Sequence, residues 1–176
     1  MTSTLQTARL FLRPFRRDDL DAMSALMVNP DFMRFSTGPY SRGQTAAFLD
    51  KIIGWDEAGL PSQFAISLPP KPDLLGYGGF FHHEVDGIQE IEIGYRLHPD
   101  HWNQGLATEA ARAVRDHGFG NLNLPRVISL IHVENAPSRR VAEKNGMLLE
   151  KETVFRGFTT QVFAISRAQW QAQRGA

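Results

Sequence analysis

The chain has 176 residues, which suits a single domain with a sizeable core, and its 19 basic and 19 acidic residues leave no net charge. This balance argues against a nucleic-acid-binding or membrane-binding surface. The lack of cysteine excludes disulfides, thiolate metal sites and a cysteine nucleophile. The N-terminus has no long apolar run behind a basic start, so we expect a cytoplasmic protein without a signal peptide.

The first half of the chain predicts one strand, two helices and the first strands of a sheet. Apolar residues alternate in the first segment, and Ser41 followed by Gln44 is typical of a capping box. Asp86-Gly87 is a hairpin signal. The expected elements are a strand over 9–15, a helix from Asp18 or Asp19 to Met27, a helix over 43–57, a strand over 63–68, a proline turn over 69–72, and strands over 74–84 and 88–97.

The second half predicts a helix, a buried strand, a short helix and a closing hairpin. Pro137 fits the first turn of the short helix, and Gly146 fits just past its end. The expected elements are a helix over 107–118, a strand over 126–133, a helix over 135–144, strands over 147–155 and 158–166, and a frayed helical end. This order predicts a single α/β domain over residues 1–176 with a mixed sheet.

A glycine turn at Gly105 is the first candidate for ligand binding. It follows the strand over 88–97 and a loop with Pro99, and it precedes a helix. Free N–H groups at a helix N-terminus and the helix dipole favour an anion, so this turn predicts a phosphate site. A plain loop before a helix is the alternative. The segment lacks both the Gly-Lys-Ser/Thr of a P-loop and the further glycines of a dinucleotide fingerprint.

Four segments resemble the GNAT superfamily of acetyl-CoA-dependent N-acetyltransferases. They read TARLFLRPFRRDDLDAM from Thr7, NPDFMRFSTGP from Asn29, WNQGLATEA from Trp102 and NAPSRRVAEKNGM from Asn135. They are most similar to the Rim-type branch, which includes the ribosomal-protein alanine N-acetyltransferases. The resemblance implies a single GNAT-like domain with a mixed, mostly antiparallel sheet flanked by helices and a splayed cleft for acyl-CoA. It also implies direct transfer of acetyl from acetyl-CoA to a primary amine, either a protein N-terminus or a small amine.

The same resemblance implies where acetyl-CoA binds. Gly105 and Ala107 match the last two positions of the family's pyrophosphate motif, and Trp102 replaces the usual Gln or Arg at its first position. Backbone groups of Tyr95 and Leu97 are expected to pair with the pantetheine arm as an added strand would, and the N–H near Leu97 to hold the thioester oxygen. The expected acetyl-CoA-binding residues are Tyr95, Arg96, Leu97, Gln104, Gly105, Leu106, Ala107, Thr108 and Asn135.

The helix over 135–144 contributes two side chains to this expectation. Asn135 matches the family asparagine that hydrogen-bonds the pantetheine arm, and it can cap the helix at the same time. Ser138 matches the serine or tyrosine beside the thioester sulfur, where it would protonate or hydrogen-bond the departing thiolate. The alternative for Ser138 is an ordinary residue in the first helical turn, bonded to Asn135.

The acceptor amine needs a base because it arrives mostly as an ammonium ion. Glu92 is the first candidate, acting directly or through a water. Alternation along the strand places it on one face with Glu90, and the isoleucines on the other, so the glutamates line the cleft if the isoleucines meet the core. Glu90 and either His82 or His83 are the alternatives for the base. A solvated carboxylate paired with a lysine or arginine is the alternative without a catalytic role.

The segment over 32–40 is expected, by the resemblance, to form one wall of the acceptor site. Phe35, Tyr40 and Trp55 are candidate aromatic contacts, although a core position is favoured for Phe35, and His82 is a candidate substrate contact. Adjacent histidines point to opposite faces of a strand, so no metal is expected. The rival function is a non-catalytic acyl-CoA-binding regulatory module, and the retained base and acid candidates favour the enzyme. A homodimer is left open.

Overall fold

The computed structural model describes residues 3–175, and in this range there are eight strands in one sheet, five α-helices and two 3-10 turns. The strands are β1 (Leu5–Gln6), β2 (Phe11–Pro14), β3 (Gln63–Leu68), β4 (Lys71–Val85), β5 (Ile88–Leu97), β6 (Arg126–His132), β7 (Leu148–Phe155) and β8 (Phe158–Ser166). The helices are α1 (Leu20–Met27), α2 (Arg42–Glu57), α3 (Leu106–Gly120), α4 (Ala136–Lys144) and α5 (Arg167–Arg174), and the 3-10 turns cover Arg17–Asp19 and Pro99–His101.

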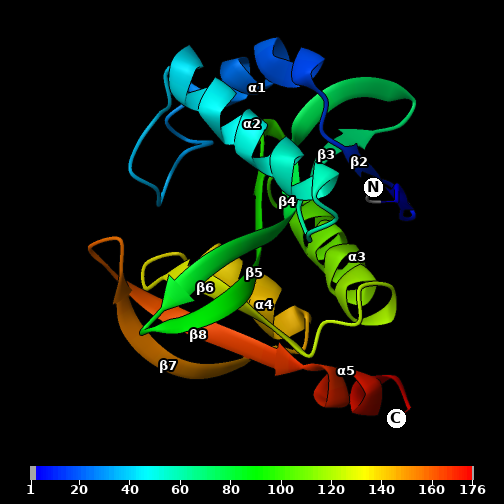
Figure 1. Ribbon diagram of the computed structural model, residues 1–176, viewed down its shortest axis with the longest axis vertical. Coiled ribbons are helices and arrows are strands. Elements are labelled where there is room, and N and C mark those ends of the chain that lie inside the picture. Colours follow the sequence, from blue (N-terminus) through cyan, green and yellow to red (C-terminus); the bar gives the residue numbers. More distant parts are fainter. Residues whose placement is uncertain (1–2, 176) are drawn as a thin grey trace.

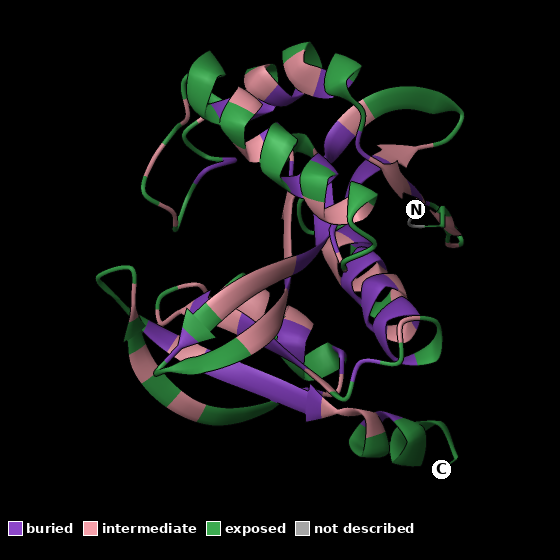
Figure 2. Ribbon diagram, viewed as in Figure 1, coloured by how far each residue is buried: buried purple, intermediate pink, exposed green. Residues whose placement is uncertain are grey.

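The sheet has the strand order β1-β2-β3-β4-β5-β6-β8-β7, and every neighbouring pair is antiparallel except β5 and β6. Helices α1 and α2 lie against one face, and α3 lies against the other (Figure 1). Side chains alternate between the two faces of β3. Phe64 and Ile66 pack in the core with α3, while Ala65 packs in the core with α1 and α2. Burial concentrates on β3, the middle of β4, β6, β8 and the inner side of α3 (Figure 2).

Strands β5 and β6 part soon after they meet. Their backbone register joins only Glu92 to Ile128, and both strands continue toward their C-terminal ends beyond this pair. Side chains replace the missing ladder bonds: the hydroxyl of Ser129 donates to the carbonyl of Ile93 at 3.0 Å, and the N–H of Leu130 donates to the Glu92 carboxylate at 3.2 Å. The gap between these two strands positions the candidate site.

Two expectations about the elements were wrong. Strand β4 begins at Lys71, so the turn is confined to Pro69 and Pro70. Pro72 is tolerated in the strand because pairing with β5 starts only at Gly76, so no β5 partner calls for its missing N–H.

The C-terminal helix is docked rather than frayed. The indole N–H of Trp170 donates to Asp116 at 2.7 Å, and its ring lies 5.3 Å from that of Phe119 in α3.

Among the described residues, no helix has the length and apolar character needed to cross a membrane.

Candidate active site

Two cavities open beside the gap between β5 and β6. The first, of about 550 Å³, is here called the aromatic cavity; it lies among α2, β4, β5 and the turn between β7 and β8, and its lining includes Tyr40, Phe48, Trp55, Tyr77, Phe81 and Phe155. The second, of about 490 Å³, is here called the loop cavity; it lies among the end of β5, the loop before α3, and α4. The two cavities share the lining residues Phe35, Tyr95, Arg96, Ser138 and Val141, so they meet at that point.

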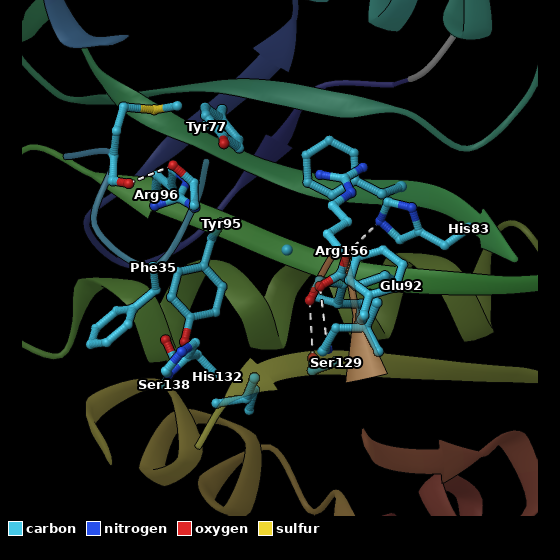
Figure 3. Close-up of a pocket in the computed structure, with 18 of the residues that line it drawn as sticks. Phe35, Tyr77, His83, Glu92, Tyr95, Arg96, Ser129, His132, Ser138 and Arg156 are labelled. Carbon is cyan, nitrogen blue, oxygen red and sulfur yellow. Dashed lines mark hydrogen bonds and ion pairs between the residues drawn. The ribbon is translucent and has the colours of Figure 1, made fainter. Parts of the chain in front are cut away.

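Glu92 lines the aromatic cavity with both carboxylate oxygens engaged. One oxygen lies 2.8 Å from Nε2 of His83 (Figure 3). The other accepts the N–H of Leu130. Both side chains of the Glu92–His83 pair are mostly buried, with exposed fractions of 12% and 10%. Gly94, next on the same face, leaves room for the ring of Phe81, which would lie only 2.9 Å from a Cβ at that position. The sheet thus holds a carboxylate–imidazole pair at the cavity wall.

The other two candidates for the base lie elsewhere. Glu90 is ion-paired to Arg126 at 3.1 Å, and Arg126 also binds Glu150 at 2.7 Å. His82 points to the opposite face from His83, where its Nε2 lies 2.8 Å from the carbonyl of Pro61. Neither Glu90 nor His82 is among the described residues that line the two cavities. The structure therefore brings His83, rather than His82, to Glu92.

Tyr95 and Ser138 face each other where the cavities meet (Figure 3). Burial raises the pKa of Tyr95 to about 12, and the neighbouring Ser138 hydroxyl acts in the opposite direction. The Tyr95 hydroxyl is buried and makes no well-formed hydrogen bond within the described part of the chain. The backbone N–H of Ser138 is bonded to the side chain of Asn135 at 3.2 Å, so its hydroxyl is not needed for helix capping. This leaves two hydroxyl groups at the junction.

Gly105 forms the N-cap of α3 in the left-handed conformation, with φ of +76°, which a β-branched side chain adopts only with strain. The first N–H groups of α3, from Leu106 to Thr108, have no intrahelical acceptor, and these residues line the loop cavity. Gln104 does not line it; its side chain donates to the carbonyl of Asp100 and its own carbonyl accepts from Arg9 at 2.9 Å. The turn therefore presents backbone donors rather than the Gln104 side chain.

An ion pair fastens this turn to the N-terminal strands. Arg9, which holds the carbonyl of Gln104, also donates from Nε to Glu109 in the first turn of α3 at 2.7 Å, and Thr7 donates to the same carboxylate. Burial alone would raise the pKa of Glu109, but the hydrogen bonds from Thr7 and Arg9 outweigh it and hold the pKa below its usual range. Sequence reasoning missed this contact because Arg9 and Glu109 lie far apart in the chain.

The end of β5 presents backbone groups to the gap. The carbonyl of Ile93 accepts from Ser129 and the carbonyl of Leu97 accepts from the indole N–H of Trp102 at 2.8 Å. Backbone groups alternate in direction along a strand, so those of Tyr95, midway between, face the same gap. The Leu97 carbonyl is already occupied by Trp102, and among the described residues β6 pairs with β5 only at Glu92, so the N–H of Leu97 and both backbone groups of Tyr95 have no partner strand.

The segment between α1 and α2 contributes lining residues to both cavities. Arg96 donates to the carbonyls of Phe32 and Arg34, at 3.0 and 2.7 Å, and so ties this segment to β5. Phe35 is 38% exposed, lies at the junction of both cavities and packs on His132 at 5.2 Å, so the favoured core position for it was wrong. Its neighbour Phe32 takes the core position instead.

Comparison with known proteins agrees with this geometry. A family model described as an acetyltransferase (GNAT) domain matches residues 9–148. The chain belongs to the GNAT family of acetyltransferases. It is 31% identical, over 94% of its length and 98% of the relative's, to the uncharacterized N-acetyltransferase YnaD of Bacillus subtilis. It is similar to the crystal structure of an acetyltransferase from Agrobacterium tumefaciens, with a TM-score of 0.80, 30% identity and coverage of 94% and 95% of the two chains.

A third similarity concerns the coenzyme. RimL, a ribosomal α-N-protein acetyltransferase solved in complex with coenzyme A, matches with a TM-score of 0.78, 18% identity and coverage of 93% and 98% of the two chains. At that identity the likeness shows the fold alone, so the Rim-type branch stays a prediction. As a GNAT enzyme, this protein is an acetyl-CoA-dependent N-acetyltransferase.

The loop cavity fits acetyl-CoA by the chemistry of its lining. Free helix N–H groups behind Gly105 suit a pyrophosphate, and the free backbone groups of Tyr95 suit the amides of a pantetheine arm. Basic side chains outnumber acidic ones around this cavity, with Arg34, Arg96, Arg140 and Lys144 against Asp31. Among the described residues, no group of three or more His, Asp or Glu side chains lies close enough to hold a metal ion.

Proposed function

We propose that this enzyme transfers acetyl directly to a primary amine held in the aromatic cavity, either a protein N-terminus or a small amine. The observation that carries the proposal is the junction itself. A carboxylate–imidazole pair, Glu92 and His83, lines one cavity, and two hydroxyls stand where that cavity meets the one suited to acetyl-CoA. The resemblance to the Rim-type branch supports a protein N-terminus as the first acceptor to test.

Glu92 and His83 are the proposed proton acceptor. An ammonium ion cannot attack a carbonyl carbon, so the amine must first lose a proton to a group within hydrogen-bond reach or one water away. Because Glu92 contacts Nε2 of His83, a proton taken by either group is shared with the other. The peptide N–H of Leu130 donates to the other carboxylate oxygen and holds the side chain in place.

Ser138 is the proposed donor to the leaving sulfur. Acetyl transfer to the amine breaks the thioester C–S bond of acetyl-CoA. The departing coenzyme A thiolate then needs a proton or a hydrogen bond. The Ser138 hydroxyl lies at the junction and is the less buried of the two hydroxyls there, since Ser138 is half-buried whereas Tyr95 Oη is fully enclosed. The raised pKa of Tyr95 keeps its hydroxyl protonated, so Tyr95 can donate to Ser138 and support its role.

The test is an amine panel in which released thiol is measured with a chromogenic reagent. The panel contains peptides with free N-termini, amino acids, polyamines and aminoglycosides, with a reaction lacking amine as the background. We expect amine-dependent thiol release with at least one class. Tight coenzyme A binding by calorimetry, combined with no thiol release above background for any amine, would instead support a non-catalytic acyl-CoA-binding module.

A further inference from the structure

The charged residues of the aromatic cavity are strongly unequal in sign. Among the described residues that line it, the fixed cations are Lys51, Arg96 and Arg156, and the only carboxylate is Glu92. The whole chain is neutral, so this surplus is local. His83 and His132 add two imidazoles and no negative charge. An acceptor in this cavity therefore meets a positive electrostatic field with a single negative point.

The single negative point is already committed to the amine. Glu92 contacts His83 and Leu130, and under the proposed function it takes the proton of the acceptor. A polyamine would place its further ammonium groups beside Lys51, Arg96 and Arg156, which costs like-charge repulsion in a partly enclosed space. The cavity thus disfavours an acceptor with several positive charges.

Arg156 is the cation best placed to hold an anion near the amine. It sits at the turn between β7 and β8, and within the described residues no carboxylate lies within 4.0 Å of its guanidinium. Its guanidinium packs on the ring of Phe155 at 5.1 Å, Phe155 packs on His83 at 5.0 Å, and His83 binds Glu92. The side chain projects into the cavity beside His83 and Glu92 (Figure 3). The ring of Phe155 therefore contacts both the guanidinium of Arg156 and the imidazole of His83.

The remaining lining is apolar and aromatic. Rings from α2, β4 and the β7–β8 hairpin, namely Phe48, Trp55, Tyr77, Phe81 and Phe155, surround the space between the cations. Lys51 on α2 lies over the ring of Trp55 at 4.9 Å, so a second cation stands on the α2 side of the cavity. Such a lining suits an apolar body, and a volume of about 550 Å³ suits a small molecule or the end of a peptide.

We propose that the acceptor is a primary amine that carries a carboxylate close to the amine and an apolar body, and that Arg156 binds this carboxylate. The chemistry is that of an apolar amino acid, or of a peptide N-terminus with an acidic side chain near it. This inference rests on the proposed function, because it names the substrate class of the same site. The cation–carboxylate contact takes no part in bond formation or proton transfer, so it acts through substrate binding.

The test compares matched amines. L-Phenylalanine and L-leucine are paired with their decarboxylated counterparts, 2-phenylethylamine and 3-methylbutylamine, and spermidine represents the polycations. A peptide beginning Ala-Asp is paired with one beginning Ala-Asn to distinguish an acidic peptide from a free amino acid. A charged hydrogen bond between Arg156 and the carboxylate should lower KM for the carboxylate member of a pair. We expect its kcat/KM to be about tenfold or more higher, either in the amino acid pairs or in the peptide pair.

Variants assign the preference to its residue. Arg156→Gln is expected to raise KM for the carboxylate amines and to remove most of the difference within each pair, while Arg156→Lys keeps part of it. Arg174→Gln is the matched control, because its guanidinium packs on Trp170 in α5 and does not line the cavity. High salt should shrink the difference as well.

The outcomes separate the two proposals. Thiol release that is equal within the pairs, or fastest with spermidine, contradicts the carboxylate inference and leaves the acetyltransfer to an amine intact. An Arg156→Gln variant that slows all amines equally also contradicts it. No thiol release with any amine contradicts the proposed function, and the carboxylate inference falls with it.

Discussion

Glu92 accepts the backbone N–H of Leu130 at the point where β5 and β6 part. One carboxylate oxygen thus replaces a missing ladder bond of the sheet, and the other meets His83. The same side chain therefore has a structural contact and a chemical one. A glutamine at this position keeps an oxygen for Leu130 but cannot take a proton, so it separates the two contributions.

Glu92→Gln is expected to lower kcat at neutral pH by about 10²–10⁴-fold, the usual contribution of a general base. Turnover should recover partly at high pH, where more of the amine is already deprotonated. A pH–rate profile of the purified variant measures this. Glu90→Gln is the matched control, because Glu90 pairs with Arg126 and lines neither cavity. A Glu92→Gln profile identical to that of the wild type would point to His83 as the base instead.

Ser138→Ala is expected to lower kcat by about tenfold or more if its hydroxyl assists the leaving sulfur. The binding of coenzyme A should change little, since the backbone N–H that meets Asn135 is retained. Steady-state kinetics with calorimetry of coenzyme A binding give both quantities. Ser67→Ala, at the β2–β3 pair, is a control outside the cavities. An unchanged kcat would mean that Ser138 is an ordinary residue of the first helical turn.

Gly105→Val is expected to weaken coenzyme A binding about tenfold or more, because it distorts the turn whose N–H groups face the ligand. Gly59→Val is the matched control: Gly59 has a similar φ of +72° but lies after α2, with open space around it. Both variants should lose comparable stability from the left-handed backbone, about 1–2 kcal/mol. Calorimetry should show weaker binding only for Gly105→Val; equal affinities for the two variants would refute the turn as the phosphate site.

Because the hydroxyl of Tyr95 is buried, we expect the free energy of unfolding to fall at alkaline pH. Burial raises its folded pKa from 10.0 to about 12, so the neutral phenol is favoured in the folded state. Its contribution is fully present below the unfolded pKa and declines as the pH rises from 10.0 toward about 12, because the unfolded chain then releases the proton first. Urea unfolding across this range should show a decline that Tyr95→Phe reduces. Tyrosinate absorbance of the folded protein should lose one late transition in the same variant.

The sequence predicted the parts of the site that depend on local patterns. Two-residue alternation placed Glu92 on the face opposite Ile93, which packs in the core, and the glycine turn marked the start of α3. The same alternation also put Glu90 in the cleft, which was wrong, because Glu90 pairs with Arg126 and lines neither cavity. It could not choose between His82 and His83, because alternation says that they face opposite ways but not which way. The folded structure makes that choice, because His83 meets Glu92 whereas His82 meets the carbonyl of Pro61.

Contacts between distant segments were beyond the sequence. The docking of α5 depends on Trp170 meeting Asp116, and the anchoring of the turn at Gly105 depends on Arg9 meeting Glu109. The position of Arg156 in the cavity requires the curvature of the β7–β8 hairpin, which a hairpin signal does not specify. Such contacts follow from how elements pack, and single-segment patterns carry no information about them.

The sheet can be regarded as two half-sheets, β1–β5 and β6–β8, whose backbones are joined at the single register pair of Glu92 and Ile128. A ligand that pairs with Tyr95 on β5 and contacts Asn135 at the start of α4 would bridge the two half-sheets across this joint. If acetyl-CoA makes these proposed contacts, its binding and the rigidity of the joint are thermodynamically linked, and the linkage is reciprocal. Substitutions that loosen the joint, such as loss of the Ser129 hydroxyl, should weaken coenzyme binding without touching the coenzyme.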